Sequence, residues 1–250
     1  MADEPAETPA PAASQPFAGQ VALVTGSSKG IGAATAEALA AAGAHVILTG
    51  RDTKALEAIE ERIFAAGGSA TIAPVDLAEP DGIARLAAAV RGRWPALDML
   101  VINAALLPQL SSVTDIDQPS FNKAITVNVL ATQSLLAHFD SLLRKSADPR
   151  VLGLTTTVAG TPRAYWGAYA ATKAAFEVLL DCYAQEVRQV SRVRVAIVNP
   201  GATRTAMRAK AYPGEDPSSV KPPEAVARRL VALLGEQFAS PHRESINPVR

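Results

Sequence analysis

Tyr169 and Lys173 are the two residues of this sequence whose types and spacing point most directly to chemistry. They lie four residues apart in the segment YAATK, and on a helix such side chains share one face, with Cβ atoms about 5–6 Å apart. A nearby ammonium group favours the ionised form of a phenol, so Lys173 would lower the pKa of Tyr169. Such a pair can exchange a proton with a reacting oxygen atom, which is general acid–base chemistry.

A glycine-rich segment, TGSSKGIG at 25–32, suggests a second kind of chemistry. Its glycines, Gly26, Gly30 and Gly32, stand between a predicted strand and a predicted helix. Glycine allows a positive φ and lets a pyrophosphate approach the backbone, and the following helix presents free N–H groups and the positive end of its dipole. The segment therefore predicts a dinucleotide site. It lacks the GK[ST] ending of a P-loop, which argues against an NTPase.

The elements that must position these residues follow from the apolar pattern. Strands are predicted at 20–25, 46–49, 69–75, 97–102, 151–155 and 193–198, with a weak strand near 244–247. Helices are predicted at 33–42, 52–66 with Asp52 as N-cap, 80–94, 120–144, 165–190 and 224–234. Strands that read as apolar runs and alternate with helices pair in parallel through right-handed crossovers. We therefore expect the α/β class: a single-domain, Rossmann-like, doubly wound parallel sheet of six to seven strands with helices on both faces. Its ligand site should lie beyond the carboxyl ends of the strands.

Composition excludes several classes of protein. The 250 residues carry 24 basic and 24 acidic side chains, so the basic excess of a nucleic-acid-binding protein is missing. No run of roughly 18 apolar residues indicates a membrane-spanning helix. A single cysteine, Cys182, and three scattered histidines argue against a disulfide and a metal site. We expect a cytoplasmic protein without a nucleic-acid, membrane or metal partner, with Cys182 in its core. Residues 1–16 would form a disordered arm and 17–250 a single domain.

The order of the motifs resembles that of the short-chain dehydrogenase/reductase family over residues 18 to 235. That family carries TGxxxGxG, NNAG, a serine, YxxxK and PG in this order. Here the matching segments are TGSSKGIG (25–32), INAA (102–105), Thr156, YAATK (169–173) and NPG (199–201). The segments at 163–173 and 199–217 look like the YciK-like branch of that family. Ile102 and Ala105 depart from the NNAG motif, and a threonine stands in place of the serine.

This resemblance implies a role for each matching residue. Tyr169 would protonate a carbonyl oxygen as hydride arrives from nicotinamide C4, Lys173 would also bond the nicotinamide ribose, and Asn128 would complete a proton relay. The implied catalytic residues are Thr156, Tyr169, Lys173 and Asn128. The implied cofactor-binding residues are Gly26, Ser28, Lys29, Gly30, Ile31, Gly32, Arg51, Asp76, Leu77, Asn103, Ala104, Tyr169, Lys173, Pro200, Gly201, Thr203 and Thr205.

Two threonines compete for the family's serine position. Counting back 13 residues from Tyr169, and counting from the start of the predicted strand, both give Thr156. Counting back from Gly160 gives Thr157 instead. We prefer Thr156, because two frames agree on it.

The end of the second predicted strand indicates the cofactor. A carboxylate there would accept the ribose 2′-OH of NAD, but this chain has Arg51, whose guanidinium can bind phosphate oxygens in a forked geometry. Lys29 can supply a second positive charge. We expect NADP(H) to be preferred, with NAD(H) possible, and Asp76 and Leu77 to flank the adenine.

The implied function is an NAD(P)-dependent oxidoreductase that transfers hydride between NADP(H) and a small carbonyl or alcohol substrate. The alternatives are a 3-oxoacyl-carrier-protein reductase and an NADP-binding sensor or scaffold without turnover. A lid is expected at about 202–217, and Arg163, Arg204 and Arg208 predict an anionic or strongly polar substrate. The helices around 121–143 and 165–190 resemble the family's dimerisation pair, which implies a homodimer or homotetramer.

Overall fold

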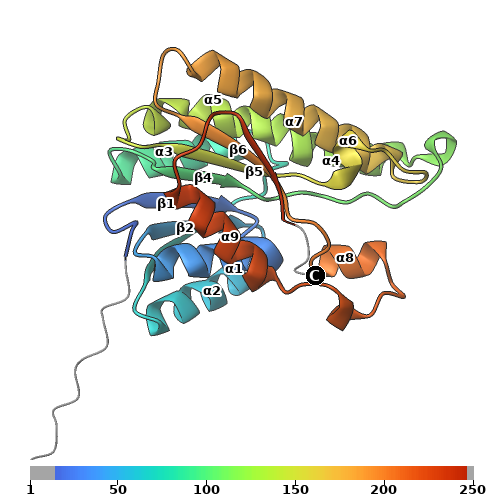
Figure 1. Ribbon diagram of the computed structural model, residues 1–250, viewed down its shortest axis with the longest axis horizontal. Helices are drawn as coiled ribbons and strands as arrows, with labels where there is room; N and C mark the ends of the chain where they lie inside the picture. The colour runs from blue at the N-terminus through green and yellow to red at the C-terminus, as the bar shows by residue number, and fades with distance from the viewer. Residues whose placement is uncertain (1–14, 247–250) are drawn as a thin grey trace, which may run out of the picture.

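Seven strands form one sheet in the computed structural model, which describes residues 15–246 (Figure 1). The strands are β1 (Val21–Thr25), β2 (His45–Gly50), β3 (Ser69–Pro74), β4 (Met99–Ile102), β5 (Arg150–Leu154), β6 (Arg194–Asn199) and β7 (His242–Ser245). Their order is β3-β2-β1-β4-β5-β6-β7, and every pairing is parallel. The predicted doubly wound sheet is confirmed, and the weak strand expected near 244–247 lies two residues earlier.

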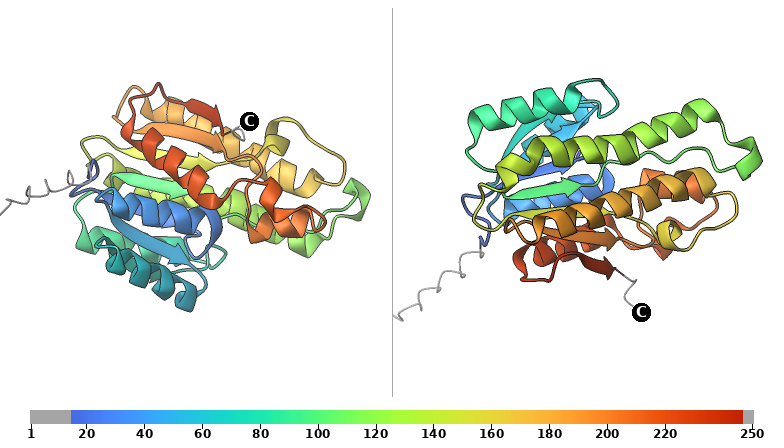
Figure 2. Two further views of the ribbon diagram at one scale, coloured as in Figure 1. Left: turned by 60° about the horizontal axis from the view of Figure 1, so that its bottom comes forward. Right: turned by 90° about the horizontal axis from the view of Figure 1, so that it is seen from above.

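Two layers of helices cover this sheet, as predicted. The main helices are α1 (Gly30–Ala41), α2 (Thr53–Ala65), α3 (Gly82–Arg93), α4 (Gln118–Ile125), α5 (Ala131–Leu143), α7 (Gly167–Val187) and α9 (Pro223–Gly235). α1, α2 and α9 lie on one face, where Leu39 and Leu230 are buried in one apolar cluster. α3, α5 and α7 lie side by side on the other face (Figure 2), where Phe139 and Leu180 belong to a second cluster.

The long helix predicted at 120–144 is not a regular α-helix. α4 and α5 are joined by a π-helical turn, η2 (Thr126–Leu130), in the middle of which lies Asn128. A π-helical turn holds one more residue than an α-helical turn, and such turns are frequent at functional sites. The apolar spacing of 120–144 fits a helix on either side of the turn, so the sequence pattern could not reveal it.

Short elements follow the carboxyl ends of β4, β5 and β6. They are η1 (Val113–Asp115), α6 (Thr157–Gly160), α8 (Ala206–Ala211) and η3 (Pro217–Ser219). α8 and η3 occupy the segment that was predicted to be a lid. The predicted arm at 1–16 lies outside the described residues, except for its last two positions.

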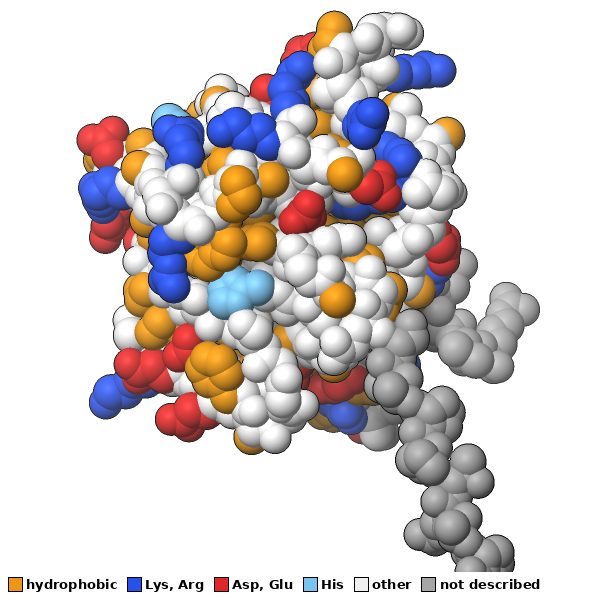
Figure 3. All heavy atoms as spheres, turned by 90° about the vertical axis from the view of Figure 1, so that its left-hand side faces the viewer, with side chains coloured by type: hydrophobic (Ala, Val, Ile, Leu, Met, Phe, Trp, Pro, Cys, Tyr) orange, Lys and Arg blue, Asp and Glu red, His pale blue; other side chains and the backbone are white. Residues whose placement is uncertain are grey.

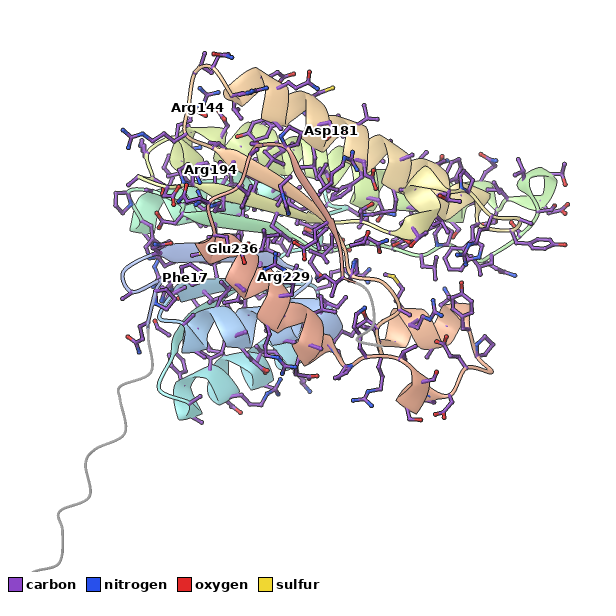
Figure 4. The ribbon with its side chains drawn as sticks, viewed as in Figure 1. Phe17, Arg144, Asp181, Arg194, Arg229 and Glu236 are labelled. Carbon is purple, nitrogen blue, oxygen red and sulfur yellow. The ribbon has the colours of Figure 1, made fainter. Side chains whose placement is uncertain are left out.

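The amino and carboxyl ends of the strands lie on opposite sides of the molecule. Phe17, just before β1, and Arg194, at the start of β6, mark the amino end, whereas α8 lies at the opposite, carboxyl end (Figure 4). Viewed from the amino end, charged side chains of both signs are scattered among apolar ones (Figure 3).

Cys182 is exposed on α7, so the expectation of a core position was wrong; its neighbour on the helix, Tyr183, points inward instead. Within residues 15–246 no helix has the length and apolar character needed to cross a bilayer.

Candidate active site

A cavity of about 390 Å³ lies at the carboxyl end of the sheet, between the ends of β5 and β6, the start of α7 and the α8 segment. Seven predicted site residues line it: Ile31, Thr156, Tyr169, Pro200, Gly201, Thr203 and Thr205. They come from segments more than 170 residues apart in the sequence, and the parallel sheet brings them together because each follows the carboxyl end of a strand.

Tyr169 lies in the first turn of α7 and is 8% exposed. Burial raises the pKa of its phenol to about 12, because the charged phenolate is poorly solvated there. Its Oη–H points to Sδ of Met207 on α8 in a long, weak hydrogen bond of 4.0 Å. The prediction that Lys173 lowers this pKa is wrong for this arrangement, because burial raises it. Tyr169 therefore carries its proton, as a general acid must.

Lys173 follows one turn later on α7 and is fully enclosed. Its Nζ donates to the Leu154 carbonyl oxygen at 2.6 Å and lies 3.5 Å from the centroid of the Phe176 ring. Burial lowers the pKa of this lysine to about 7, and the negative charge of Glu177 opposes that fall. The ammonium is thus anchored at the end of β5, directly beneath the threonines that follow this strand.

The three threonines after β5 differ in their bonding. Thr155 Oγ1 donates to Glu177 Oε1 at 2.5 Å, and Thr157 Oγ1 accepts from Asn199 Nδ2 at 2.8 Å. The Thr156 hydroxyl makes no hydrogen bond with the described residues, and it lines the cavity together with its neighbours. Among the three, Thr156 therefore has the hydroxyl available for a ligand.

The side chain of Asn128 connects the π-helical turn to the loop after β4 and to α7. It is 1% exposed; its Oδ1 accepts from Leu106 N at 2.7 Å, and its Nδ2 donates to Leu106 O and to Thr172 Oγ1, both at 2.9 Å. Thr172 in turn donates to the carbonyl oxygen of Tyr169 at 2.8 Å. The side chain of Asn128 thus holds the loop after β4 against the helix that carries Tyr169, from a position set by the π-helical turn.

The glycine segment is built for close approach of its backbone. A Cβ atom at Gly32 would lie 2.3 Å from the Gly26 carbonyl oxygen, so only glycine fits there. Gly26 and Gly30 have φ angles of 66° and 60°, which residues other than glycine rarely adopt. α1 begins at Gly30, three residues earlier than predicted, and Lys29 at its N-cap makes no side-chain cap. Its first N–H groups therefore face the loop, an arrangement that fits the pyrophosphate of a dinucleotide.

Asn103 supports this segment. Its Nδ2 donates to the carbonyl oxygens of Thr25 and Gly26, at 2.9 and 3.1 Å. The backbone N–H groups of Asn103 and Ala104 both donate to Thr25 Oγ1 at 3.0 Å. The side chain of Asn103 therefore shapes the loop, and its contact with the cofactor stays a prediction.

Arg51 and Asp76 face each other across the ends of β2 and β3. Their nearest charged atoms are 3.9 Å apart, and the Arg51 side chain is 61% exposed. Ser28 of the glycine segment adjoins the end of β2, because a Cβ at Gly50 would lie 3.6 Å from its Oγ. Lys29 is exposed beside it, and Leu77 is partly buried against the core. The predicted residues of the adenosine end thus gather at the ends of β1, β2 and β3.

The turn after β6 joins the two halves of the site. Gly201 has a φ of 66°, and a Cβ there would lie 2.8 Å from the Ile246 carbonyl oxygen. Thr203 Oγ1 donates to Gly201 O at 3.2 Å, and Thr205 caps α8 by accepting from Arg208 N at 3.1 Å. The methyl group of Thr205 lies close to Gly30, because a Cβ atom added at Gly30 would lie 3.3 Å from Thr205 Cγ2. The start of the segment at 202–217 therefore lies against the glycine segment.

Sequence reasoning missed three residues of this site. Met207 contacts the Tyr169 hydroxyl, Tyr212 lines the cavity, and Glu177 lies beside Lys173 and Thr155. Glu177 could have been found, because it is one helical turn beyond Lys173 on the same face. The positions of Met207 and Tyr212 depend on the path of the segment at 202–217, which no local pattern encodes.

The three arginines expected to bind an anion are not brought together. Arg163 and Arg208 line the cavity, but Arg204 is exposed and does not. Arg208 donates through Nε and Nη2 to both carboxylate oxygens of Glu215, at 2.7 and 2.5 Å. Its charge is therefore matched within the lid.

Known proteins resemble this chain over most of its length. The short chain dehydrogenase family model matches residues 20–216. The uncharacterized oxidoreductase YciK of Escherichia coli is 35% identical over 220 residues, which cover 87% of this chain and 86% of YciK. A short chain dehydrogenase from Shigella flexneri, solved in complex with NADP, has a TM-score of 0.89 at 33% identity and covers 92% of this chain and 98% of its own. One from Escherichia coli CFT073, complexed with NADPH, has the same TM-score and identity over 94% and 99%.

Proposed function

This chain belongs to the short chain dehydrogenase family of oxidoreductases, and from this premise we propose that it transfers hydride between NADP(H) and a small carbonyl or alcohol substrate. The observation that carries the proposal is the cavity that holds the protonated hydroxyl of Tyr169 and the uncommitted hydroxyl of Thr156 beside Ile31 of the glycine segment. A carbonyl oxygen bound there has one acid and one hydrogen-bond donor within the same pocket.

When bound, the nicotinamide would supply the hydride that reduces the carbonyl carbon. Tyr169 gives its proton to the carbonyl oxygen, so the carbonyl becomes an alcohol and the charges balance. Thr156 holds the same oxygen through its hydroxyl. Lys173, whose Nζ donates to Leu154 O at 2.6 Å, would hold the nicotinamide ribose on the same face of α7 as Tyr169. Asn128 fixes the helix that carries both residues.

The preference for NADP(H) is supported by charge at the ends of β1 and β2. Arg51 and Lys29 are exposed there, where the ribose 2′-phosphate of NADP would lie in a dinucleotide site of this kind. The relatives from Shigella flexneri and Escherichia coli were solved with NADP and NADPH. The comparisons give a 3-oxoacyl-carrier-protein reductase no advantage over this proposal.

The variant Tyr169→Phe tests the mechanism, because it keeps the ring and removes the acid. General acid catalysis contributes about 10²–10⁴-fold, so kcat for carbonyl reduction, followed as NADPH oxidation, should fall by that factor. The dissociation constant for NADPH, measured by fluorescence, should stay unchanged. Reduction by Tyr169→Phe at the wild-type rate would contradict the mechanism, and NADPH binding without turnover of any carbonyl compound would favour the sensor alternative.

A further inference from the structure

Apolar and aromatic side chains form a continuous part of the cavity wall beyond Tyr169, beside Arg163 and Arg208. Leu107 from the loop after β4, Val158 from α6, and Met207 and Ala211 from α8 line it, together with Trp166 and Tyr212. No Asp or Glu is found among the described residues of the lining. A cationic substrate would therefore lose its hydration without gaining a counter-ion.

Three aromatic rings form a continuous wall from the acid to the lid. The ring of Trp166 lies with its centroid 6.1 Å from that of Tyr169, at an interplanar angle of 58°. On its other side it lies 5.7 Å from Tyr212, at 34°. These are the tilted arrangements that aromatic rings prefer. The rings contact one another, so a ligand would stack on the wall rather than between its members.

The lid holds the outermost ring in place. The guanidinium carbon of Arg208 lies 3.6 Å from the centroid of Tyr212, and the same guanidinium binds Glu215 in a forked geometry. Arg208 thus orders an aromatic ring while its own charge is neutralised by Glu215. Arg163 is exposed and makes no side-chain hydrogen bond with the part of the chain that the structure describes. Beside the paired guanidinium of Arg208, the segment therefore presents the Tyr212 ring, the Met207 thioether and Ala211 to the cavity.

We propose that the substrate is a carbonyl compound bearing an aromatic ring, which stacks on the wall formed by Trp166 and Tyr212 while its carbonyl oxygen meets Tyr169 and Thr156. This inference rests on the proposed oxidoreductase function and names its substrate class. The cavity of about 390 Å³ also includes Ile31 and Gly201, which belong to the nicotinamide side.

Two neutral aldehydes with seven carbon atoms, benzaldehyde and cyclohexanecarbaldehyde, test the proposal with NADPH. They differ in the planarity and π-electrons of the ring. The difference in their intrinsic reactivity is the same for every variant, so it cancels when the kcat/KM ratio of one variant is compared with that of another. The ratio of their kcat/KM values should fall about five-fold in Tyr212→Leu and in Trp166→Leu, which keep apolar side chains but lose the rings. Phe64→Leu, which removes an exposed ring from α2, should leave the ratio unchanged.

A binding measurement separates the substrate class from turnover. In the variant Trp94→Phe, Trp166 is the remaining tryptophan, and quenching of its fluorescence reports binding. In the NADP⁺ complex of this variant, the dissociation constant of benzyl alcohol should be at least about five-fold lower than that of cyclohexylmethanol. This preference should disappear on adding Tyr212→Leu. Tighter binding of the aromatic alcohol without any turnover would overturn the proposed function and leave the aromatic class standing.

Three results would overturn the aromatic class itself. They are a kcat/KM ratio unchanged by both ring variants, equal binding of the two alcohols, and a preference for 4-carboxybenzaldehyde that is lost in Arg163→Ala but not in Tyr212→Leu. The last result would show recognition of an anion in place of a ring.

Discussion

Thr155, Thr156 and Thr157 are consecutive residues of one type, yet their surroundings give each a different task. Thr155 donates to Glu177, and Glu177 in turn accepts from Arg243 of β7 at 2.6 Å. Thr157 bonds Asn199 at the end of β6. Both hydroxyls tie neighbouring elements together, and Thr156 is left to face the cavity. At this scale, function is assigned by which hydrogen bonds are already made.

Substitutions at Thr156 and Thr157 should therefore have different effects. Thr156→Ala removes a donor to the carbonyl oxygen and should lower kcat by about 10²-fold, whereas Thr156→Ser keeps the hydroxyl and should retain activity. Thr157→Ala loses only the bond to Asn199 and should keep kcat within a few-fold. Steady-state kinetics with NADPH would reveal the reverse pattern, which would place the substrate hydroxyl at Thr157.

Cofactor preference should depend on two exposed cations. NADPH should bind at least about ten-fold more tightly than NADH, since a charge-assisted pair with a phosphate is worth more than the roughly 1.4 kcal/mol that this factor requires. Arg51→Ala combined with Lys29→Ala should abolish the difference. Fluorescence titration of both cofactors measures it, with Arg188→Ala, an exposed arginine at the C-terminal end of α7, as the matched control. A preference that survives the double substitution would refute the assignment.

Burial of Lys173 should make stability depend on pH. Its pKa is about 7 in the folded protein and near 10.5 in a free side chain. Below pH 7 the lysine is charged in both states, so folding carries the full cost of burying a charge. Between these two values the unfolded chain holds the extra proton, and the free energy of unfolding should rise by about 1.4 kcal/mol per pH unit.

Lys173→Met removes this dependence while keeping a long side chain. The variant should be inactive and should exceed wild type in free energy of unfolding most clearly at pH 7 and below, with the gain shrinking toward pH 10. Urea denaturation at several pH values measures the difference, and Lys123→Met, at an exposed lysine of α4, serves as control. A gain that is the same at every pH would show that charge burial is not its cause.

Single elements carry the next level of organisation, and β5 shows it at both ends. At its carboxyl end Leu154 O anchors Lys173. At its amino end Arg150 is 2% exposed, pairs with Asp148 through both terminal nitrogens and lies 5.5 Å from the ring centroid of Phe238. Its Nε is buried without a partner among the described residues. The strand is thus fixed at one end by a buried charge while the other end supports the site.

Asp148→Ala should be more destabilising than Arg150→Met. Removing the carboxylate leaves a buried guanidinium unpaired, which typically costs about 3–5 kcal/mol, and water screening at the partly exposed Asp148 should reduce this to about 2–3 kcal/mol. Methionine removes the charge and keeps much of the packing. Chemical denaturation should also show the double variant to be more stable than Asp148→Ala alone; an additive loss would contradict this account.

At the scale of the whole molecule, the sequence could predict what local rules determine. Asp52 was expected to cap α2 and accepts from Ala55 N at 3.1 Å. Six strands were predicted from apolar runs, and the weak seventh strand was predicted two residues too late. The π-helical turn could not be predicted, because Asn128 is held by residues 22 and 44 positions away in the sequence. The pairing of Arg208 with Glu215 likewise depends on the path of the lid. Long-range contacts, rather than periodicity, set the details of the site.

The predicted homodimer or homotetramer stays a prediction, as do a cytoplasmic location and the extent of the single domain. Two large apolar side chains on the layer of α5 and α7 are exposed, Leu130 by 56% and Val178 by 59%. Leu130 ends the π-helical turn before α5 and Val178 lies on α7, within the ranges 121–143 and 165–190 where the family resemblance places a subunit contact.

The π-helical turn also limits how the length of this chain can change. Deleting one residue from 126–130 would let the helix close into regular α-helical hydrogen bonds, which removes a local irregularity. The two halves would then turn by about 100° relative to each other. Either the buried face of α5, including Phe139, would leave the core, or Asn128 would leave Leu106 and Thr172. Surface loops of this fold can gain or lose residues. A single deletion here would make the helix more regular, but it would displace Tyr169, the proton donor.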